Sequence, residues 1–315
     1  MSLTIGVDIG GTKVAAAVVD EKGEILQSSR RPTPSQNADG LIQAVAECVN
    51  ELRAQHDVEA IGVGTAGWIS SDRSTLLYSP NMGMRDVPMR DLIAEQCKLP
   101  VFIENDANVA MWAEFRFGAA QDANTAVLYT IGTGVGGAIV VDGNMVRGTH
   151  GTAGELGHVR VVPDGRRCGC GRWGCLEQYA SGDALTLHAQ EAAKSNPHEA
   201  EYLLSLAGDD ADQITGAMVT KAAQNDDRTA LRAFNFIGRF LGNAAADMVQ
   251  SLDPGVILLG GGVVDAGDFL LAPVRRYLND GLAARRETPY GIVRAARMGQ
   301  NAGVVGAADL ARQDL

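Results

Sequence analysis

A strand-turn-strand pattern that occurs twice constrains the fold of this chain more than any other feature of its sequence. Residues 5–20 and 129–142 each contain an apolar strand, a glycine turn and a second apolar strand. Aligning Ile9 with Ile131 superimposes a glycine at the start of both turns and an aspartate at the end of both segments. The repeat predicts two similarly built α/β halves that face each other across a cleft and offer turn amides to one ligand.

Three glycine clusters are candidates for nucleotide binding. Backbone amides in a glycine turn can form an anion-binding concavity, and Lys13 adds a positive charge suited to phosphate. The third cluster follows a buried, strand-like run over residues 256–259, where a base and ribose could lie close to the backbone. We therefore expect a nucleoside triphosphate as ligand. The clusters consist of Gly10, Gly11, Thr12 and Lys13, of Thr133 and Gly134, and of Gly260, Gly261 and Gly262.

Two other interpretations of the glycines conflict with their context. Residues 132–137 and 62–67 match the Gly-x-Gly-x-x-Gly fingerprint, but dinucleotide-binding proteins place a helix directly after that turn. Strand-like residues follow Gly137, and no convincing helix follows Gly67. The chain contains no Gly-x-x-x-x-Gly-Lys-Ser/Thr phosphate loop. A role as hairpin turns without a ligand stays open at this point.

Four potential zinc ligands lie close together in the sequence. They are His158, Cys168, Cys170 and Cys175, and Glu177 follows the last of them. Thiolate and imidazole are the groups that tetrahedral zinc prefers, and four protein ligands leave no open position for water. We therefore expect a structural zinc that holds Glu177 and its neighbours in place.

Disulfides are a weaker explanation for these cysteines. Cys168 and Cys170 are separated by one residue, which is poor geometry for a bridge. The chain begins without a basic region or an apolar signal core, so we expect a reducing compartment, the cytoplasm. Cys48 and Cys97 lie in apolar-periodic stretches and are expected to be small buried hydrophobes.

Length and composition set the remaining bounds. At 315 residues the chain is longer than one usual core, so two domains are expected. A hydrophobic content of 46% without long apolar runs is typical of a globular protein. The formal net charge of -11 argues against nucleic acid or an anionic membrane as a partner.

Apolar periodicity and boundary residues predict alternating α/β structure. Asn301 is a candidate cap for the last helix. The predicted helices cover residues 41–52, 91–97, 105–117, 181–194, 215–224, 229–251 and 301–312, with strands at 61–64 and 100–103.

Asp106 is the best candidate for a catalytic residue. It follows a buried strand at the point where a helix begins, and α/β proteins place ligands at the carboxyl ends of strands. Helix-terminal amides favour an ionised carboxylate there, which could accept a proton from an attacking hydroxyl. The alternative, that Asn105 or Asp106 only caps the helix, is left open. Acid and amide side chains suit a polyhydroxylated substrate, and the candidates are Asn81, Asn105, Asp106, Glu155 and Glu177.

Four motifs in this order resemble the repressor, ORF and kinase (ROK) family of sugar kinases over essentially the whole chain. They lie at residues 8–13, 104–108, 154–158 and 168–177. The resemblance implies an actin-like, ribonuclease H-like fold with two α/β lobes, a duplicated core and a cleft for ATP and Mg²⁺. It also implies transfer of the γ-phosphoryl group to a sugar 6-hydroxyl. Within the family, residues 158–168 and 176–182 look most like actinobacterial-type glucokinases, which favours glucose.

The resemblance also implies residue roles. Asp106 is expected to be the base, and Asp8 to orient Mg²⁺. His158 is expected to bind zinc through one nitrogen and a sugar hydroxyl through the other. The expected sugar contacts are Asn81, Asn105, Asp106, Glu155, His158 and Glu177, and the three glycine clusters are expected to contact the nucleotide.

Several expectations have alternatives. The predicted smaller lobe comprises residues 1–115 plus 300–315, and the larger lobe residues 116–299. N-acetylglucosamine, mannose or N-acetylmannosamine could replace glucose, and polyphosphate could replace ATP. Relatives are usually homodimers or homotetramers. Some ROK relatives are sugar-responsive repressors with an added DNA-binding domain. We do not expect this function here, because the first glycine hairpin begins at Ile5 and leaves no room for such a domain. The acidic balance also provides no basic face for DNA.

Overall fold

The computed structural model describes residues 2–34, 37–80, 82–282 and 288–315. Contacts divide the chain into two units, and each is described by itself. Unit 1 comprises Met1–Ala123, Ala138–Gly154 and Ala296–Leu315, and unit 2 comprises Asn124–Gly137 and Glu155–Ala295. The predicted lobe boundaries stay a prediction.

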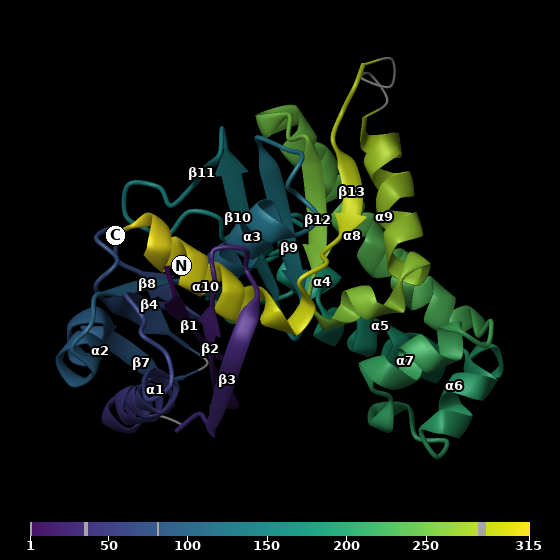
Figure 1. The fold of residues 1–315 in the computed structure, drawn as a ribbon. Coiled ribbons are helices and arrows are strands. Elements are labelled where there is room, and N and C mark those ends of the chain that lie inside the picture. The colour runs from purple at the N-terminus through teal and green to yellow at the C-terminus, as the bar shows by residue number, and fades with distance from the viewer. Residues whose placement is uncertain (1, 35–36, 81, 283–287) are drawn as a thin grey trace. The chain divides into compact units, whose positions relative to one another are not determined.

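The N-terminal segment forms a five-stranded sheet with the order β3-β2-β1-β4-β8 (Figure 1). The first three strands are antiparallel neighbours, whereas β1, β4 and β8 run parallel. The carboxyl ends of β1, β4 and β8 therefore meet at one edge of the sheet. The strands are β1 Thr4–Ile9, β2 Lys13–Val19, β3 Ile25–Pro32, β4 Ala60–Thr65 and β8 Val101–Asn105.

Residue alternation along β1 explains how helices cover this sheet. Ile5, Val7 and Ile9 point to one face, where they join a core with α1 (Ala38–Arg53) and α2 (Met89–Cys97). The intervening Gly6 lies under α10 (Ala302–Gln313), which also packs on α3 (Asp106–Phe117).

Two glycines let α10 lie directly on the strands. Gly6 and Gly62 are register partners on β1 and β4. A Cβ atom would lie 1.7 Å from the Val304 carbonyl oxygen at Gly6 and 1.8 Å from the Ala307 carbonyl oxygen at Gly62. No side chain fits in that space, so both positions require glycine for this packing. A smaller sheet in unit 1 contains β5 Trp68–Ile69, β6 Leu76–Ser79 and β7 Met84–Val87.

The second five-stranded sheet has the order β11-β10-β9-β12-β13. β9, β12 and β13 are parallel, and β10 pairs with β11 in antiparallel fashion. Its strands are β9 Ala126–Ile131, β10 Val135–Val141, β11 Asn144–Met145, β12 Val256–Gly260 and β13 Ile292–Ala295.

The structure confirms the internal repeat. The bounds of β9 (Ala126–Ile131) lie 122 residues beyond those of β1 (Thr4–Ile9), and β10 (Val135–Val141) has the same offset from β2 (Lys13–Val19). In both sheets the copied strands are followed by parallel strands in the same spatial order. The predicted α/β class with a duplicated, ribonuclease H-like core is therefore confirmed.

Helices of unit 2 pack around the long α8, which has 25 residues. Gly238 and Gly242 on α8 bring it close to α9, because a Cβ at either glycine would meet α9 atoms at less than 3 Å. The helices are α4 Glu177–Ala180, α5 Gly182–Ser195, α6 Glu201–Leu206, α7 Gly216–Ala223, α8 Arg228–Leu252 and α9 Asp268–Gly281. Short 3₁₀ turns are η1 Leu156–His158, η2 Pro197–Ala200, η3 Ala211–Gln213, η4 Gly262–Ala266 and, in unit 1, η6 Gly299–Asn301.

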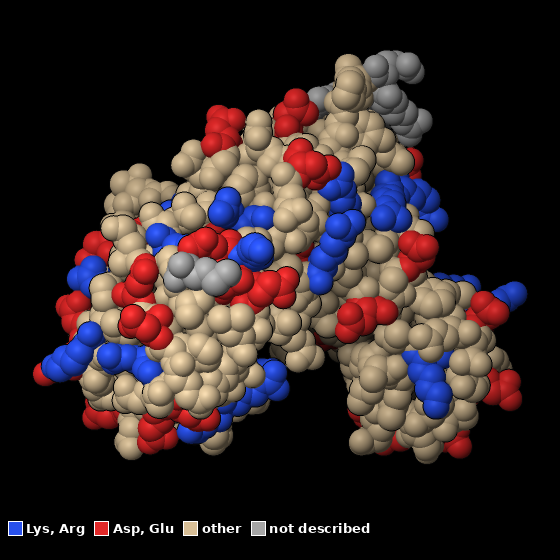
Figure 2. Space-filling model, viewed as in Figure 1, with Lys and Arg blue, Asp and Glu red and all other residues tan. Residues whose placement is uncertain are grey.

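All seven helices predicted from the sequence are present with small shifts at their ends. Asn301 precedes α10 as predicted, but its side chain makes no capping hydrogen bond. The prediction missed α9 and the small β5-β6-β7 sheet, whose strands are two to four residues long. Figure 2 shows acidic and basic side chains interspersed over the face in view. Within the described residues, no helix combines the length and apolarity needed to span a membrane.

Candidate active site

We name the junction of β8 and α3 in unit 1 the catalytic turn, because it carries Asp106, the candidate catalytic residue. Asn105 is the N-cap of α3, and its Oδ1 accepts hydrogen bonds from Ala107 N at 2.9 Å and Asn108 N at 3.2 Å. Its Nδ2 donates to the Gly67 carbonyl oxygen at 3.1 Å. Asn105 therefore caps the helix, and the catalytic role of Asp106 stays a prediction.

Asp106 is the first residue of α3 and is exposed. Its Oδ1 accepts a hydrogen bond from Ala107 N at 2.9 Å. Desolvation by the surrounding protein raises the pKa of this carboxyl above its usual value, although the bond from Ala107 opposes the shift. A carboxylate with a raised pKa is a stronger base, so Asp106 is suited to accept a proton from a hydroxyl group.

Asp8 lies at the end of β1, on the same sheet edge as the catalytic turn. Burial raises its pKa to about 6, with a further contribution from the negative charge of Asp106 and an opposing one from Lys13. A Cβ at Gly303, in the first turn of α10, would lie 2.6 Å from the Asp8 carboxyl carbon. Unit 1 therefore holds two interacting carboxylates beside a helix N-terminus, an arrangement suited to a divalent cation.

Each repeated glycine turn is closed by a hydrogen bond from its first glycine, which spans three residues in the first turn and two in the second. Gly10 N donates to the Lys13 carbonyl oxygen at 3.0 Å, and Gly132 N donates to the Gly134 carbonyl oxygen at 3.0 Å. The first turn is also fixed by Thr33, whose Oγ1 donates to the Gly10 carbonyl oxygen at 2.7 Å.

Open space adjoins one glycine in the first cluster, one in the third, and Gly132, which directly precedes the second. A Cβ at Gly11, Gly132 or Gly262 would meet no other atom within 4 Å, and none of the three has a positive φ. Neither packing within the chain nor backbone strain therefore explains why these residues are glycines. The open space is compatible with a ligand against the backbone, and nucleotide binding by these clusters stays a prediction.

The predicted metal ligands converge in unit 2. One potential ligand atom from each of His158, Cys168, Cys170 and Cys175 lies within 4.8 Å of the others. The Cys170 and Cys175 sulfurs are 3.7 Å apart, and Cys168 Sγ is 3.6 Å from His158 Nδ1. Tetrahedral zinc with its usual bond lengths requires about 3.8 Å between sulfurs and about 3.6 Å between sulfur and nitrogen. The four residues therefore fit zinc in both chemistry and spacing.

Burial also affects the protonation of this cluster. It raises the pKa of the Cys168 thiol well above its ordinary value. Since zinc binds the thiolate, metal binding must release this proton, and zinc affinity is expected to decrease at lower pH.

The orientation of His158 separates its two nitrogens. Nδ1 faces the Cys168 sulfur, whereas Nε2 lies 4.0 Å from Glu155 Oε2. A metal on Nδ1 would fix the proton on Nε2, which then becomes a hydrogen-bond donor on the side of Glu155.

Glu177 connects the zinc cluster to the second glycine turn. Its Oε1 lies 3.5 Å from Cys168 Sγ, and its Oε2 accepts a hydrogen bond from Val135 N at 3.2 Å. A Cβ at Gly134 would lie 2.4 Å from Glu177 Oε2, so this glycine makes room for the carboxylate. The sequence indicated the carboxylate but gave no signal for its contact with the turn.

The structure thus groups the predicted residues within each unit. Asp8, Asn105, Asp106 and the first glycine turn belong to unit 1, whereas Glu155, His158, Glu177, the thiols and the other two glycine clusters belong to unit 2. Asn81 lies outside the described residues.

Residues 4–314 match the ROK family, and the chain belongs to this family. It is 42% identical over 313 residues to a glucokinase of Streptomyces coelicolor, with 99% of this chain and 98% of that protein covered. A crystal structure of a ROK family glucokinase from Streptomyces griseus in complex with glucose and AMPPNP is 45% identical, with a TM-score of 0.88 over 99% of this chain and all of that one. An N-acetylmannosamine kinase of Yersinia pseudotuberculosis is 35% identical over 321 residues and the full length of both chains.

Proposed function

We propose that this protein is a glucokinase that transfers the γ-phosphoryl group of ATP to the 6-hydroxyl of glucose. The carrying observation is the catalytic turn, where Asn105 caps α3 and Asp106 has a carboxyl with a raised pKa beside Asp8. The similarity to two Streptomyces glucokinases over nearly the whole chain supports this substrate.

Asp106 is assigned the role of general base. It would hold the 6-hydroxyl and take its proton as the oxygen attacks the γ-phosphorus. Phosphoryl transfer through a loose transition state needs mainly alignment and charge neutralisation. At the sugar 6-hydroxyl, a single carboxylate that orients the hydroxyl and removes its proton is therefore sufficient for catalysis.

The other sugar hydroxyls are assigned to polar side chains that together supply hydrogen-bond donors and acceptors. Asn105, Glu155, His158 and Glu177 have this role, as does Asn81 by the family resemblance. The fixed Nε2 donor of His158 and the nearby Glu155 carboxylate provide one donor and one acceptor for a pair of hydroxyls.

The glycine clusters are assigned to ATP. Gly10, Gly11, Thr12 and Lys13 with Thr133 and Gly134 would contact phosphates, and Gly260, Gly261 and Gly262 would border the nucleoside. Mg²⁺, which would neutralise phosphate charge, is assigned to the region of Asp8. Zinc is assigned to His158, Cys168, Cys170 and Cys175 in a structural role.

A hexose panel tests the function. Sugar-dependent ADP release should be fastest with glucose and ATP, and slower with mannose, N-acetylglucosamine and N-acetylmannosamine. Higher efficiency with N-acetylmannosamine would favour the activity of the Yersinia relative instead. A second series with polyphosphate identifies the phosphoryl donor. Location in the cytoplasm, where ATP is available and thiols stay reduced, and assembly as a homodimer or homotetramer stay predictions.

A further inference from the structure

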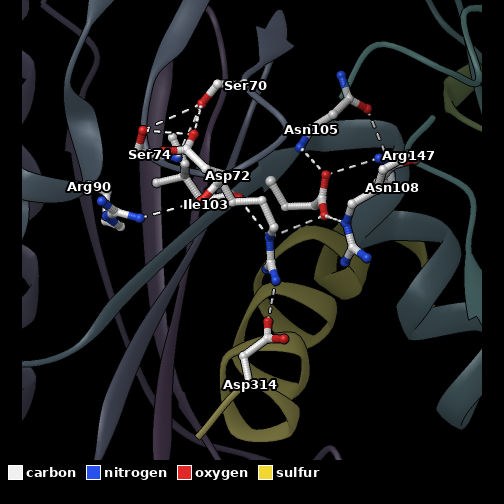
Figure 3. Close-up of polar contacts among 11 residues, drawn as sticks. Ser70, Asp72, Ser74, Arg90, Ile103, Asn105, Asn108, Arg147 and Asp314 are labelled. Atoms are coloured by element: carbon white, nitrogen blue, oxygen red, sulfur yellow. Dashed lines mark hydrogen bonds and ion pairs between the residues drawn. The ribbon is translucent and has the colours of Figure 1, made fainter. Parts of the chain in front are cut away.

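A buried carboxylate directly before the catalytic turn is left unused by the proposed mechanism. Glu104 is only 3% exposed, although it is charged and precedes Asn105. Its Oε1 accepts hydrogen bonds from Asn105 N at 3.0 Å and from Asn108 Nδ2 at 2.9 Å. Both donors, Asn105 and Asn108, belong to the turn that carries Asp106 (Figure 3), so Glu104 helps to fix this turn.

The second oxygen of Glu104 faces two arginines. Arg147 Nε donates to Oε2 at 2.6 Å, and Arg73 Nε lies 3.6 Å from the same oxygen. Arg73 also donates to the Ile103 carbonyl oxygen and pairs with Asp314 (Figure 3). Two arginines and two carboxylates thus form a chain whose formal charges balance, which offsets the cost of burying the Glu104 carboxyl.

Several hydrogen bonds fix the turn that contains Arg73. Its backbone has a φ of 56°, which is unusual for a residue other than glycine. The turn is held by Asp72, whose Oδ1 accepts hydrogen bonds from Ser70 Oγ at 2.6 Å and Ser74 Oγ at 2.9 Å. A strained backbone that is retained by several hydrogen bonds indicates that the position of this guanidinium matters.

Arg147 brings in a second segment of the chain. It lies after β11, in the loop that leads along the chain to Glu155, a proposed sugar ligand. Its carbonyl oxygen accepts a hydrogen bond from Ala153 N at 3.0 Å. In the same loop, Gly151 lies against β5, because a Cβ there would be 2.3 Å from the Ile69 carbonyl oxygen. The loop therefore contacts other parts of unit 1 at two points, through Arg147 on Glu104 and through Gly151 on β5.

We propose that Glu104 and Arg147 are a positioning pair that fixes the catalytic turn and the loop preceding Glu155 in one geometry. The inference rests on the proposed function, because it concerns the placement of Asp106, the proposed base, and of the unit 1 loop that leads to Glu155. Neither residue touches the substrate or the reacting atoms. Their effect on turnover would arise through alignment, where a displacement of 1 Å can cost about 10²-fold in rate.

A purely structural role makes a different prediction from a positioning role. A structural pair would lower stability but leave the kinetics of the folded enzyme unchanged. Asp309 provides a matched control, since it is a buried carboxylate of unit 1 that contacts Trp112, Arg116 and Arg312 between α3 and α10. It lies away from the catalytic turn and has no assigned role in the reaction.

The test compares Glu104→Gln, Arg147→Gln, Arg147→Lys and Asp309→Asn by thermal unfolding and steady-state kinetics at a temperature where all are folded. Glu104→Gln should lower kcat by at least about tenfold and raise the glucose KM, with little change in the ATP KM. Arg147→Gln should mainly raise the glucose KM. Arg147→Lys, which keeps the charge, should recover part of this loss. Asp309→Asn should lower the unfolding temperature but keep kcat and both KM values.

The double variant Glu104→Gln/Arg147→Gln measures the coupling. Its loss in kcat/KM should be smaller than the product of the two single losses, because the singles each disrupt the same pair. Wild-type kinetics in folded Glu104→Gln, or equal kinetic losses in Asp309→Asn, would overturn the proposal. If Glu104→Gln does not fold, unchanged glucose KM in both Arg147 variants overturns it. A wild-type protein without hexose-dependent ADP release would instead refute the proposed function.

Discussion

Replacement of Asp8 by Asn should make unit 1 more stable at neutral pH while impairing the enzyme. In the folded protein, burial and the nearby Asp106 raise the pKa of Asp8 from 3.8 to about 6. The folded state therefore holds a proton on Asp8 at pH values where the unfolded chain has released it. For a carboxyl with this shift, stability is highest below pH 4 and decreases as the pH rises through 6.

The magnitude follows from the shift of about two pKa units. At 1.36 kcal/mol per unit, Asp8 costs wild type up to about 3 kcal/mol of folding free energy above pH 7. Asn cannot ionise and avoids this cost. The stability difference between Asp8→Asn and wild type should therefore increase by about 3 kcal/mol between pH 4 and pH 7.5.

Urea unfolding at a series of pH values, without Mg²⁺ or nucleotide, measures this difference. Tryptophan fluorescence reports mainly on unit 1, because Trp68 and Trp112 belong to it and Trp173 to unit 2. Loss of zinc at acid pH affects both proteins and cancels in the comparison. Asp106→Asn should shift the wild-type transition in stability to lower pH, because it removes the negative charge that helps to raise the Asp8 pKa.

A stability difference that does not vary between pH 4 and pH 7.5 would refute the reasoning. Addition of Mg²⁺ and ATP gives an independent check. A bound cation stabilises ionised Asp8, so wild type should gain more stability from these ligands than Asp8→Asn.

Three further predictions concern the site and the fold. Asp106→Asn should lower kcat by roughly 10² to 10⁴ while glucose affinity by calorimetry changes little, and near-normal turnover would exclude Asp106 as the base. Cys170→Ala should lose zinc, as measured by metal analysis. It should also raise the KM for both glucose and ATP, because Glu177 contacts both the cluster and the second glycine turn. The control Cys48→Ala, outside the cluster, should keep the metal. Gly62→Ala should lower the free energy of unfolding in urea by at least about 1–3 kcal/mol, because its Cβ would overlap Ala307. Gly11→Ala should keep the wild-type stability and raise the ATP KM. Equal stability losses in the two variants would contradict this distinction.

The repeated unit could be predicted from the sequence because its signal is local. An apolar strand, a glycine turn and a second strand are readable from neighbouring residues, and a constant offset relates the two copies. The candidate zinc ligands can also be predicted from the sequence, since they lie within a short segment and have distinctive chemistry. Their convergence in unit 2 confirms that they were correctly grouped.

Contacts between distant residues could not be predicted in this way. Glu104 and Arg147 are far apart in the sequence, and neither lies in a pattern that identifies its partner. The same limit applies to Glu177 and Val135. The sequence predicts Glu177 as a sugar ligand, but the hydrogen bond that Glu177 accepts from Val135 in the glycine turn depends on how unit 2 folds. Local motifs therefore identify the candidate reactive residues, whereas the residues that hold them in place depend on the tertiary fold.

The close contact of α10 with Gly6 and Gly62 has a consequence for biosynthesis. Residues 302–313 leave the ribosome after every residue of unit 2, yet they cover strands that are made before unit 2. One face of β1 and β4 therefore remains uncovered by this helix while the rest of the chain is translated. Unit 2 can complete its own packing first, although domains usually fold from the N-terminus onward. The first sheet can therefore be closed on this face only after α10 has been translated.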